Sequence, residues 1–159
     1  MVAVLGRRLF LVDLPFKNHA MRCEAAKALA AHGAKAASAL PALDVAVAVA
    51  DKAQIAMAML ERKSKAAAEA NLQFDLFADP DALAAVRSAL EADAWKQETP
   101  AARLENSSAR VLRYLADPSA SEFANIPSYS SDRPNPNGEL ALLIQVGEAA
   151  RAAAKTIRG

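Results

Sequence analysis

The chain has 159 residues, which is enough for one domain with a substantial hydrophobic core. About a quarter of the residues are alanine and only 5% are aromatic, while the formal net charge is +1. This charge excludes a strong electrostatic attraction to nucleic acid or to an anionic membrane. Because alanine favours helices and is rare in strands, the composition predicts an all-α fold, an alanine-rich helical bundle or an array of helical hairpins.

Residues 1–19 are predicted to form an extended lead-in to a single helical domain. Pro15 interrupts this segment, and its apolar residues do not recur at helical spacing. The apolar side chains of Phe10, Leu14 and Phe16 would be exposed to water unless other residues bury them. We therefore predict that these three residues contact a partner protein.

Residues 20–116 are predicted to form the helical core. Apolar residues recur at helical spacing up to residue 32, and Gly33 is a typical residue to end a helix. A second helix is expected to begin near Pro41, which suits a first helical turn because its missing amide hydrogen is not needed there. No glycine or proline follows until Pro80, so this helix is predicted to be long.

A strand is the alternative for residues 43–50. Leu43, Val45, Val47 and Val49 alternate with other residues, which is the pattern of a half-buried strand. Most of the alternating positions are alanine, and the flanking residues are strong helix formers. These two features favour the helix without excluding the strand.

Two further helices are predicted from their starting signals. Asp79 and Pro80 form an N-cap followed by a proline in the first turn, and Thr99 and Pro100 repeat this pattern. The second of these helices should end before Pro118. Their short connection predicts an antiparallel pair, with the following apolar residues turned inward: Leu83, Val86, Leu90, Ala94, Leu104, Val111 and Leu115.

Residues 117–138 are predicted to form a long irregular arm, because they contain four prolines and several serines and show no helical period. Phe123, Ile126 and Tyr129 are the exceptions in this polar segment. Large apolar side chains on an extended segment commonly bind a partner. We predict that these three residues do so, and that neighbouring proteins hold the arm in place.

The last predicted helix spans residues 139–158. Gly147, Ala150 and Ala154 lie on its apolar face. Because their side chains are small, we expect a neighbouring helix to approach this face closely.

Residues 21–43, MRCEAAKALAAHGAKAASALPAL, resemble one unit of the HEAT-like α-solenoid family. The shared features are an alanine-rich helix, a turn that contains glycine, and a second helix that begins with Leu-Pro-Ala-Leu. The resemblance implies stacked helix pairs and a role as a binding scaffold. The chain departs from the family after this unit, because no second Leu-Pro-Ala-Leu follows and a solenoid needs at least three repeats.

Candidate metal ligands are few. His19 and Cys23 are four residues apart and would share one face of a helix, but two ligands do not make a site. His32 points in another direction, and the chain has no further cysteine or histidine. We therefore expect no metal site.

Paired acids suggest general acid and base catalysis at two places, Asp79 with Asp81 and Glu91 with Asp93. The first pair is better explained as negative charge at a helix N-terminus. Neither a glycine-rich phosphate loop nor a motif for a nucleophilic serine is present in the sequence. We therefore expect no catalytic residue and no cofactor.

The sequence favours a non-catalytic structural or accessory subunit of a larger multi-protein assembly, whose partners are other protein subunits. The first alternative is a free-standing HEAT-like module that binds a peptide or nucleic acid, and a small-molecule enzyme comes last. No apolar run reaches the roughly 20 residues of a membrane-spanning helix, although peripheral contact with a membrane stays open. An intracellular location is expected, in the mitochondrion if Arg7 and Arg8 belong to a presequence and otherwise in the cytoplasm.

Overall fold

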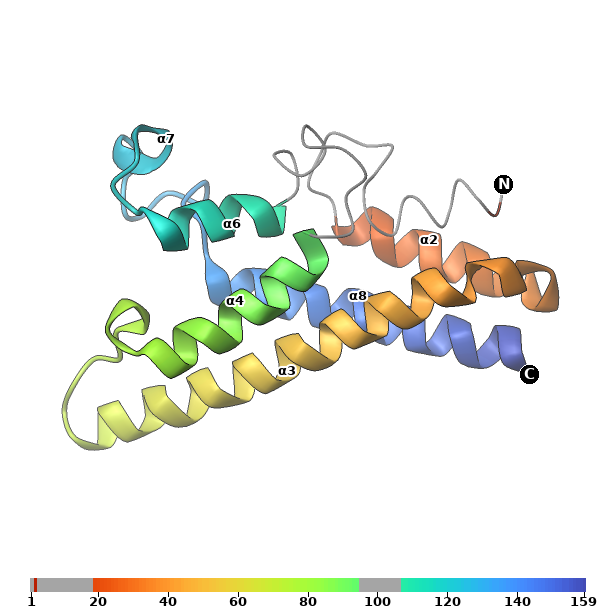
Figure 1. The fold of residues 1–159 in the computed structure, drawn as a ribbon, viewed down its shortest axis with the longest axis horizontal. Coiled ribbons are helices and arrows are strands. Elements are labelled where there is room, and N and C mark those ends of the chain that lie inside the picture. The colour runs from red at the N-terminus through yellow and green to blue at the C-terminus, as the bar shows by residue number, and fades with distance from the viewer. Residues whose placement is uncertain (1, 3–18, 95–106) are drawn as a thin grey trace.

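The computed structural model describes residues 2, 19–94 and 107–159, and every regular element in these residues is a helix (Figure 1). The predicted all-α fold is confirmed. The predicted lead-in lies outside the described residues except for Val2 and His19, and His19 is already the first residue of a helix.

The first half of the chain forms α2 (His19–Ala31), the 3-10 helix η1 (Gly33–Ala39) and the long helix α3 (Leu40–Glu69). Gly33 has a φ of +57°, a left-handed conformation that glycine adopts without steric cost, and it ends α2 as predicted. Pro41 lies in the first turn of α3. With 30 residues, α3 is about 45 Å long.

Residues 43–50 are helical, so the alternative of a strand is wrong. The buried side chains here include Leu43, Ala46 and Ala50, which follow the helical spacing of three to four residues. Val45 and Val47, which suggested the strand, are half-buried at the edges of this face. Leu43 and Val49 thus share one helical face with Ala46 and Ala50.

The helix α4 (Pro80–Ala94) begins where its capping signal predicts. Asp79 is the N-cap, and its Oδ1 atom accepts a hydrogen bond of 3.1 Å from the backbone N–H of Ala82. The other carboxylate oxygen accepts a bond of 2.7 Å from Lys63 Nζ on α3. The cap therefore also ties the start of α4 to α3, after the short 3-10 helix η2 (Leu76–Ala78).

The second half of the described chain contains α6 (Ser107–Ala116), the single turn α7 (Ser121–Ala124) and α8 (Pro136–Arg158). As predicted, α6 ends before Pro118. The signal of Thr99 and Pro100 and the residue Leu104 lie outside the described residues.

The predicted boundaries of the arm need correction at two points. The arm, residues 117–138, is not irregular throughout, because it contains α7. Its last residues belong to α8, which begins at Pro136 rather than at residue 139. The reason is local: the side chain of Asn135 accepts a hydrogen bond of 3.1 Å from Gly138 N–H and so caps the helix, and Pro136 suits the first turn.

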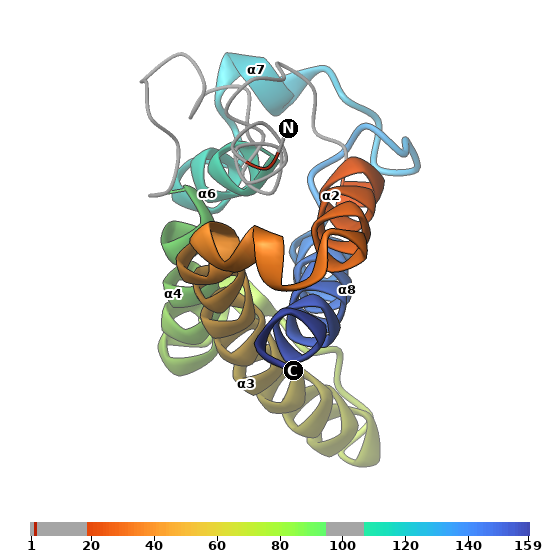
Figure 2. The same cartoon turned by 90° about the vertical axis from the view of Figure 1, so that its right-hand side faces the viewer.

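The long helix α3 is the central element of the bundle. α8 packs along one side of α3 and α4 along the other. Figure 2, seen along the bundle, shows α2 beside α8 and α6 over α4. The arm and η2 both lie toward the end of the molecule where α8 begins (Figure 1).

The contact between α3 and α8 is very close, as the small residues of the last helix predict. A Cβ atom added to Gly147 would lie 2.0 Å from Cβ of Ala50, which is far inside van der Waals contact. Two ion pairs follow the exposed edge of the same contact, Arg158 to Asp44 at 2.6 Å and Arg151 to Asp51 at 2.8 Å. From the first ion pair to the second, the residue number rises by seven on α3 and falls by seven on α8, so the two helices run antiparallel.

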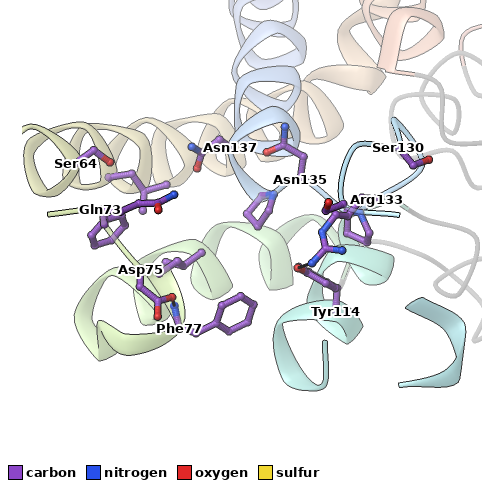
Figure 3. Close-up of a pocket in the computed structure, with 15 residues that line it drawn as sticks. Ser64, Gln73, Asp75, Phe77, Tyr114, Ser130, Arg133, Asn135 and Asn137 are labelled. Atoms are coloured by element: carbon purple, nitrogen blue, oxygen red, sulfur yellow. Dashed lines mark hydrogen bonds between the residues drawn. The ribbon is translucent and has the colours of Figure 1, made fainter. Parts of the chain in front are cut away.

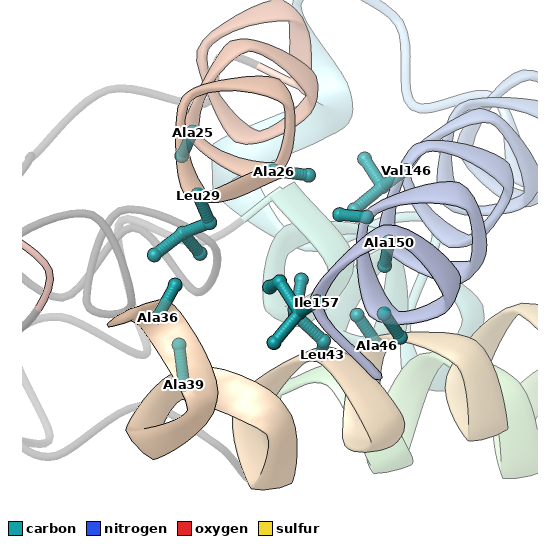
Figure 4. Packing of buried hydrophobic residues seen from close by; sticks show 12 residues of the cluster. Ala25, Ala26, Leu29, Ala36, Ala39, Leu43, Ala46, Val146, Ala150 and Ile157 are labelled. Atoms are coloured by element: carbon teal, nitrogen blue, oxygen red, sulfur yellow. The ribbon is translucent and has the colours of Figure 1, made fainter. Parts of the chain in front are cut away.

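The core divides into two clusters of different composition. The first joins α2, η1, the start of α3 and the end of α8, and alanine dominates it (Figure 4). Its buried residues are Ala25, Ala26, Leu29, Ala36, Ala39, Leu43, Ala46, Val146, Ala150, Ala153, Ala154 and Ile157. The second cluster joins α3, α4, α6 and the start of α8, and leucine and valine supply more of its volume. Short side chains in the first cluster let the helix backbones approach one another, so contact between backbones and methyl groups replaces bulky side chains.

Candidate functional site

An open cleft of about 690 Å³ lies between η2, the second half of α3, α6 and the arm (Figure 3). Its volume falls within the range of roughly 300–1,000 Å³ that is usual for ligand sites. The first residues of α8 form one part of its wall. Several of the side chains that line the cleft, among them Gln73, Asp75 and Asn137, are exposed to solvent, so the cleft is shallow.

Three aromatic rings connect the cleft to the arm. Tyr114 on α6 packs edge to face against Phe77 of η2, with ring centroids 5.9 Å apart and planes at 76°. On its other side Tyr114 packs against Phe123 of α7, at 5.3 Å and 81°. Such edge-to-face pairs stabilise the arrangement beyond the burial of area alone.

Polar side chains of α6 also hold the arm. Arg113 donates two hydrogen bonds to the carboxylate of Glu122, at 3.0 and 2.6 Å. Arg110 donates to the backbone oxygen of Asp132 at 2.8 Å, and its guanidinium lies 5.6 Å from the ring centroid of Phe123. We expected neighbouring proteins to hold the arm, but contacts within the chain already fix it against α6.

Arg133 provides the cationic side chain in the lining of the cleft. Its Nη2 atom donates a hydrogen bond of 3.1 Å to the hydroxyl of Tyr114, and its guanidinium lies 5.6 Å from the centroid of the same ring. These two contacts orient the side chain, which stays exposed to solvent (Figure 3). Among the described residues Arg133 has no carboxylate within ion-pairing distance, so the charge is held in place but is not neutralised there.

The remaining polar lining is mostly uncharged. Ser64, Gln73, Asn135 and Asn137 supply hydroxyl and amide groups that both donate and accept hydrogen bonds. Asp75 supplies a carboxylate, and its Oδ1 already accepts a bond of 3.0 Å from Phe77 N–H. These groups can recognise a ligand through hydrogen bonds.

A second polar group lies buried where α2, α4, α6 and α8 meet. Arg22 Nη2 and Nη1 donate to Asp93 Oδ1 and Oδ2 at 2.6 and 3.3 Å, and both side chains are almost completely buried. Ser108 Oγ lies 2.9 Å from Asp93 Oδ2 and 3.0 Å from Glu139 Oε1. A serine hydroxyl carries one hydrogen, so Ser108 can donate to one of these carboxylates at a time.

Glu139 receives further contacts at the same oxygen. His19 Nε2 lies 3.0 Å from Oε1, and Ser107 Oγ donates to that atom at 2.6 Å. We refer to His19, Arg22, Asp93, Ser107, Ser108 and Glu139 as the buried polar network. It connects the first residue of α2 to the first turns of α6 and α8 and to the end of α4.

Burial and hydrogen bonding change the pKa values of the carboxylates in this network in opposite directions. Burial alone would raise the pKa of Asp93, but the charge and hydrogen bonds of Arg22, together with Ser108, outweigh burial and hold the pKa below its usual range. Burial would likewise raise the pKa of Glu139. The hydrogen bond and charge of His19 and the hydroxyl of Ser107 outweigh it, with Ser108 adding to them when it donates to Glu139 instead of Asp93, so this pKa is also lowered.

The buried polar network differs from a serine–histidine–carboxylate triad. In a triad the serine and the carboxylate contact opposite nitrogens of the imidazole ring. Here Ser107 Oγ, at 3.5 Å, and Glu139 Oε1, at 3.0 Å, both approach Nε2 of His19. The arrangement is that of a structural connection between helices.

The residues predicted to bind a partner occupy different environments. Phe123 is buried against Tyr114 and Ile126 is half-buried, whereas the side chain of Tyr129 is 90% exposed. Phe10, Leu14 and Phe16 lie outside the described residues. Of the predicted residues that the structure describes, Tyr129 is the one whose side chain is free to meet another molecule.

The buried polar network and the pairing of Arg133 with Tyr114 were not predicted from the sequence. A signal for the network was present, because Asp93 continues the buried face of Val86 and Leu90 at helical spacing. The pairing proposed from sequence, Glu91 with Asp93, does not occur: Glu91 is exposed and Asp93 is completely buried. Nothing comparable in the sequence indicated the contact of Arg133.

Within residues 2, 19–94 and 107–159, no three histidine, cysteine or acidic side chains gather as a metal site. Cys23 is half-buried, and burial raises the pKa of its thiol. None of the helices described in the structure combines the length and the hydropathy needed to cross a bilayer. Comparison of the chain with protein-family models, with curated proteins and with solved structures finds no match.

Proposed function

We propose that the protein is a non-catalytic accessory subunit of a larger protein assembly, and that it contacts a neighbouring subunit through the arm. The observation that carries this proposal is the exposure of Tyr129. Its side chain is 90% exposed, although it belongs to a segment that Phe123, Glu122 and Arg133 fasten to α6. A large aromatic side chain gains free energy when a partner covers it, and little backbone entropy is lost on binding because the arm is held on both sides of Tyr129.

Leu72 and Phe77 are also exposed apolar side chains, and Phe77 lines the cleft. Leu72 and Phe77 belong to the loop between α3 and α4, and their exposed fractions are 68% and 45%. Aromatic residues are enriched at protein interfaces. We refer to Phe77 and Tyr129, with the cleft between η2 and the arm, as the arm surface.

Site-specific photo-crosslinking in the cells that make the protein tests this proposal. A photoreactive phenylalanine analogue replaces Tyr129 in one variant and Ile55 in a control. Ile55 is also well exposed, at 65%, but it lies on α3 outside the arm surface. We expect a discrete crosslinked protein from position 129 and none of that size from position 55. Absence of a product at position 129, or the same products at both positions, would contradict the proposal.

A further inference from the structure

We propose that the cleft between η2 and the arm binds an extended segment of a partner protein, and that Arg133 holds an acidic side chain of that segment. The inference rests on the proposed function and adds the chemistry of the partner. The ligand of the cleft is then an extended peptide, and Arg133 selects peptides that carry an acidic side chain.

The first reason is the state of Arg133. The guanidinium is oriented by the hydroxyl and the ring of Tyr114, but one hydrogen bond uses a small part of its five N–H donors. A fixed guanidinium binds a carboxylate through two parallel hydrogen bonds, and little side-chain entropy remains to be lost. The cleft therefore offers a position for one negative charge beside Arg133, whereas the carboxylate of Asp75 on the η2 side disfavours a second one.

The second reason is the N-terminus of α8, which lines the same cleft. This helix has 23 residues, and its first turn carries a partial positive charge, which the buried carboxylate of Glu139 in the same turn offsets in part. Pro136 has no N–H, and those of Gly138 and Glu139 are bonded to Asn135. The N–H of Asn137 has no acceptor in the described part of the chain. Arg133 and this first turn therefore both favour a negatively charged group in the ligand.

The remaining lining favours a polypeptide over other anions. An extended peptide presents backbone N–H and C=O groups in alternation, and the amides and hydroxyls of Gln73, Asn135 and Ser64 can pair with both. The exposed ring of Phe77 offers contact for an apolar side chain. A nucleic acid would need several cations along its backbone, whereas Arg133 is the one cationic side chain in the lining.

The test is selection of binding sequences from a displayed library of short random peptides, with the full chain as the target. We expect enrichment of peptides that carry Asp or Glu next to an apolar residue. A selected peptide should bind the Arg133→Gln variant roughly tenfold or more weakly, because a charge-assisted pair is lost. Arg87→Gln is the matched control, since Arg87 lies on α4 in a separate pocket beside Lys52 and does not line this cleft, and affinity should not change.

Several outcomes would overturn the inference. The first is that no peptide sequence is enriched, and the second is that the enriched peptides lack an acidic residue. The third is that a selected peptide binds the parent and the Arg133→Gln variant with equal affinity, when circular dichroism shows the same helical content in both. Tighter binding of a single-stranded oligonucleotide than of the selected peptides would also overturn it. If crosslinking at Tyr129 persists in any of these cases, the cleft is not the peptide site but the proposed function of the arm stands.

Discussion

Gly147 on α8 lies directly against Ala50 on α3, so closely that a Cβ atom on Gly147 would come within 2.0 Å of the methyl carbon of Ala50. This contact explains the alanine content of the chain in physical terms. Two long helices that carry methyl groups or hydrogen at their contact bring their backbones together, and many weak dispersion contacts replace a few large ones. The same contact fixes α8, whose first turn lines the cleft.

Substitution of Gly147 by Ala should therefore destabilise the protein although alanine is the better helix former. Overpacking of a filled contact costs about 1–3 kcal/mol, and the gain in helix propensity returns about 1 kcal/mol at most. We expect a lower free energy of unfolding, measured by urea denaturation. Adding Ala50→Gly should recover part of the lost free energy of unfolding, because it removes the methyl group that overlaps with the new side chain. A double variant that is less stable than the sum of the two single effects would contradict the packing described here.

Removal of the buried carboxylate of Asp93 should be among the most damaging single changes. Asp93→Ala takes the charge partner from Arg22 in a site from which water is excluded, and such changes cost about 3–5 kcal/mol. Replacing both residues together, Arg22→Met with Asp93→Leu, should restore much of that loss. Asp44→Asn is the control, because its ion pair with Arg158 is half exposed and should contribute about 1 kcal/mol or less. Equal effects of Asp93→Ala and Asp44→Asn would exclude a buried pair.

Acid should weaken the fold through Glu139. Its pKa is lowered in the folded protein, so the unfolded chain binds the proton more readily as the pH falls. The stabilisation is complete above the ordinary value of 4.5 and is lost as the pH falls through the lower folded value. Thermal unfolding of Glu139→Gln should show a shallower decrease of Tm below pH 4.5 than the parent. Glu148→Gln, an exposed position on the same helix, should leave that decrease unchanged.

Phe123 should control the order of the arm without controlling the bundle. Phe123→Ala removes a buried ring from its contact with Tyr114, a change that typically costs about 3–5 kcal/mol in a core. Amide hydrogen exchange in residues 118–133 should become faster, while α3 and α8 stay protected. Tyr129→Ala should leave the same exchange unchanged, because its side chain is exposed. Fast exchange of these amides already in the parent chain would show that the arm is not docked.

The features that were predictable from sequence are those that depend on neighbouring residues. The start of α4 follows from Asp79 and Pro80, and the end of α2 follows from Gly33, because capping is decided within one helical turn. The close approach at Gly147 was also predictable, since a residue without a side chain on the apolar face of a helix leaves room for a neighbouring backbone.

The features that were not predictable depend on partners distant in sequence. His19 and Glu139 are 120 residues apart, and no local pattern indicates that they share a hydrogen bond. The arm shows the same limit: Phe123 and Tyr129 are both aromatic residues on one segment, and a tertiary contact with Tyr114 decides which is buried. The local pattern does not distinguish the two.

The most direct test of the proposed role is the apparent mass of the chain in an unfractionated native extract, measured at its natural abundance by size-exclusion chromatography. We predict that the parent chain and the Ile55→Ala control migrate as a species much heavier than one chain, and that Tyr129→Ala shifts toward the monomer. Migration of the parent chain as a monomer under these conditions would contradict an accessory subunit that binds its neighbour through the arm.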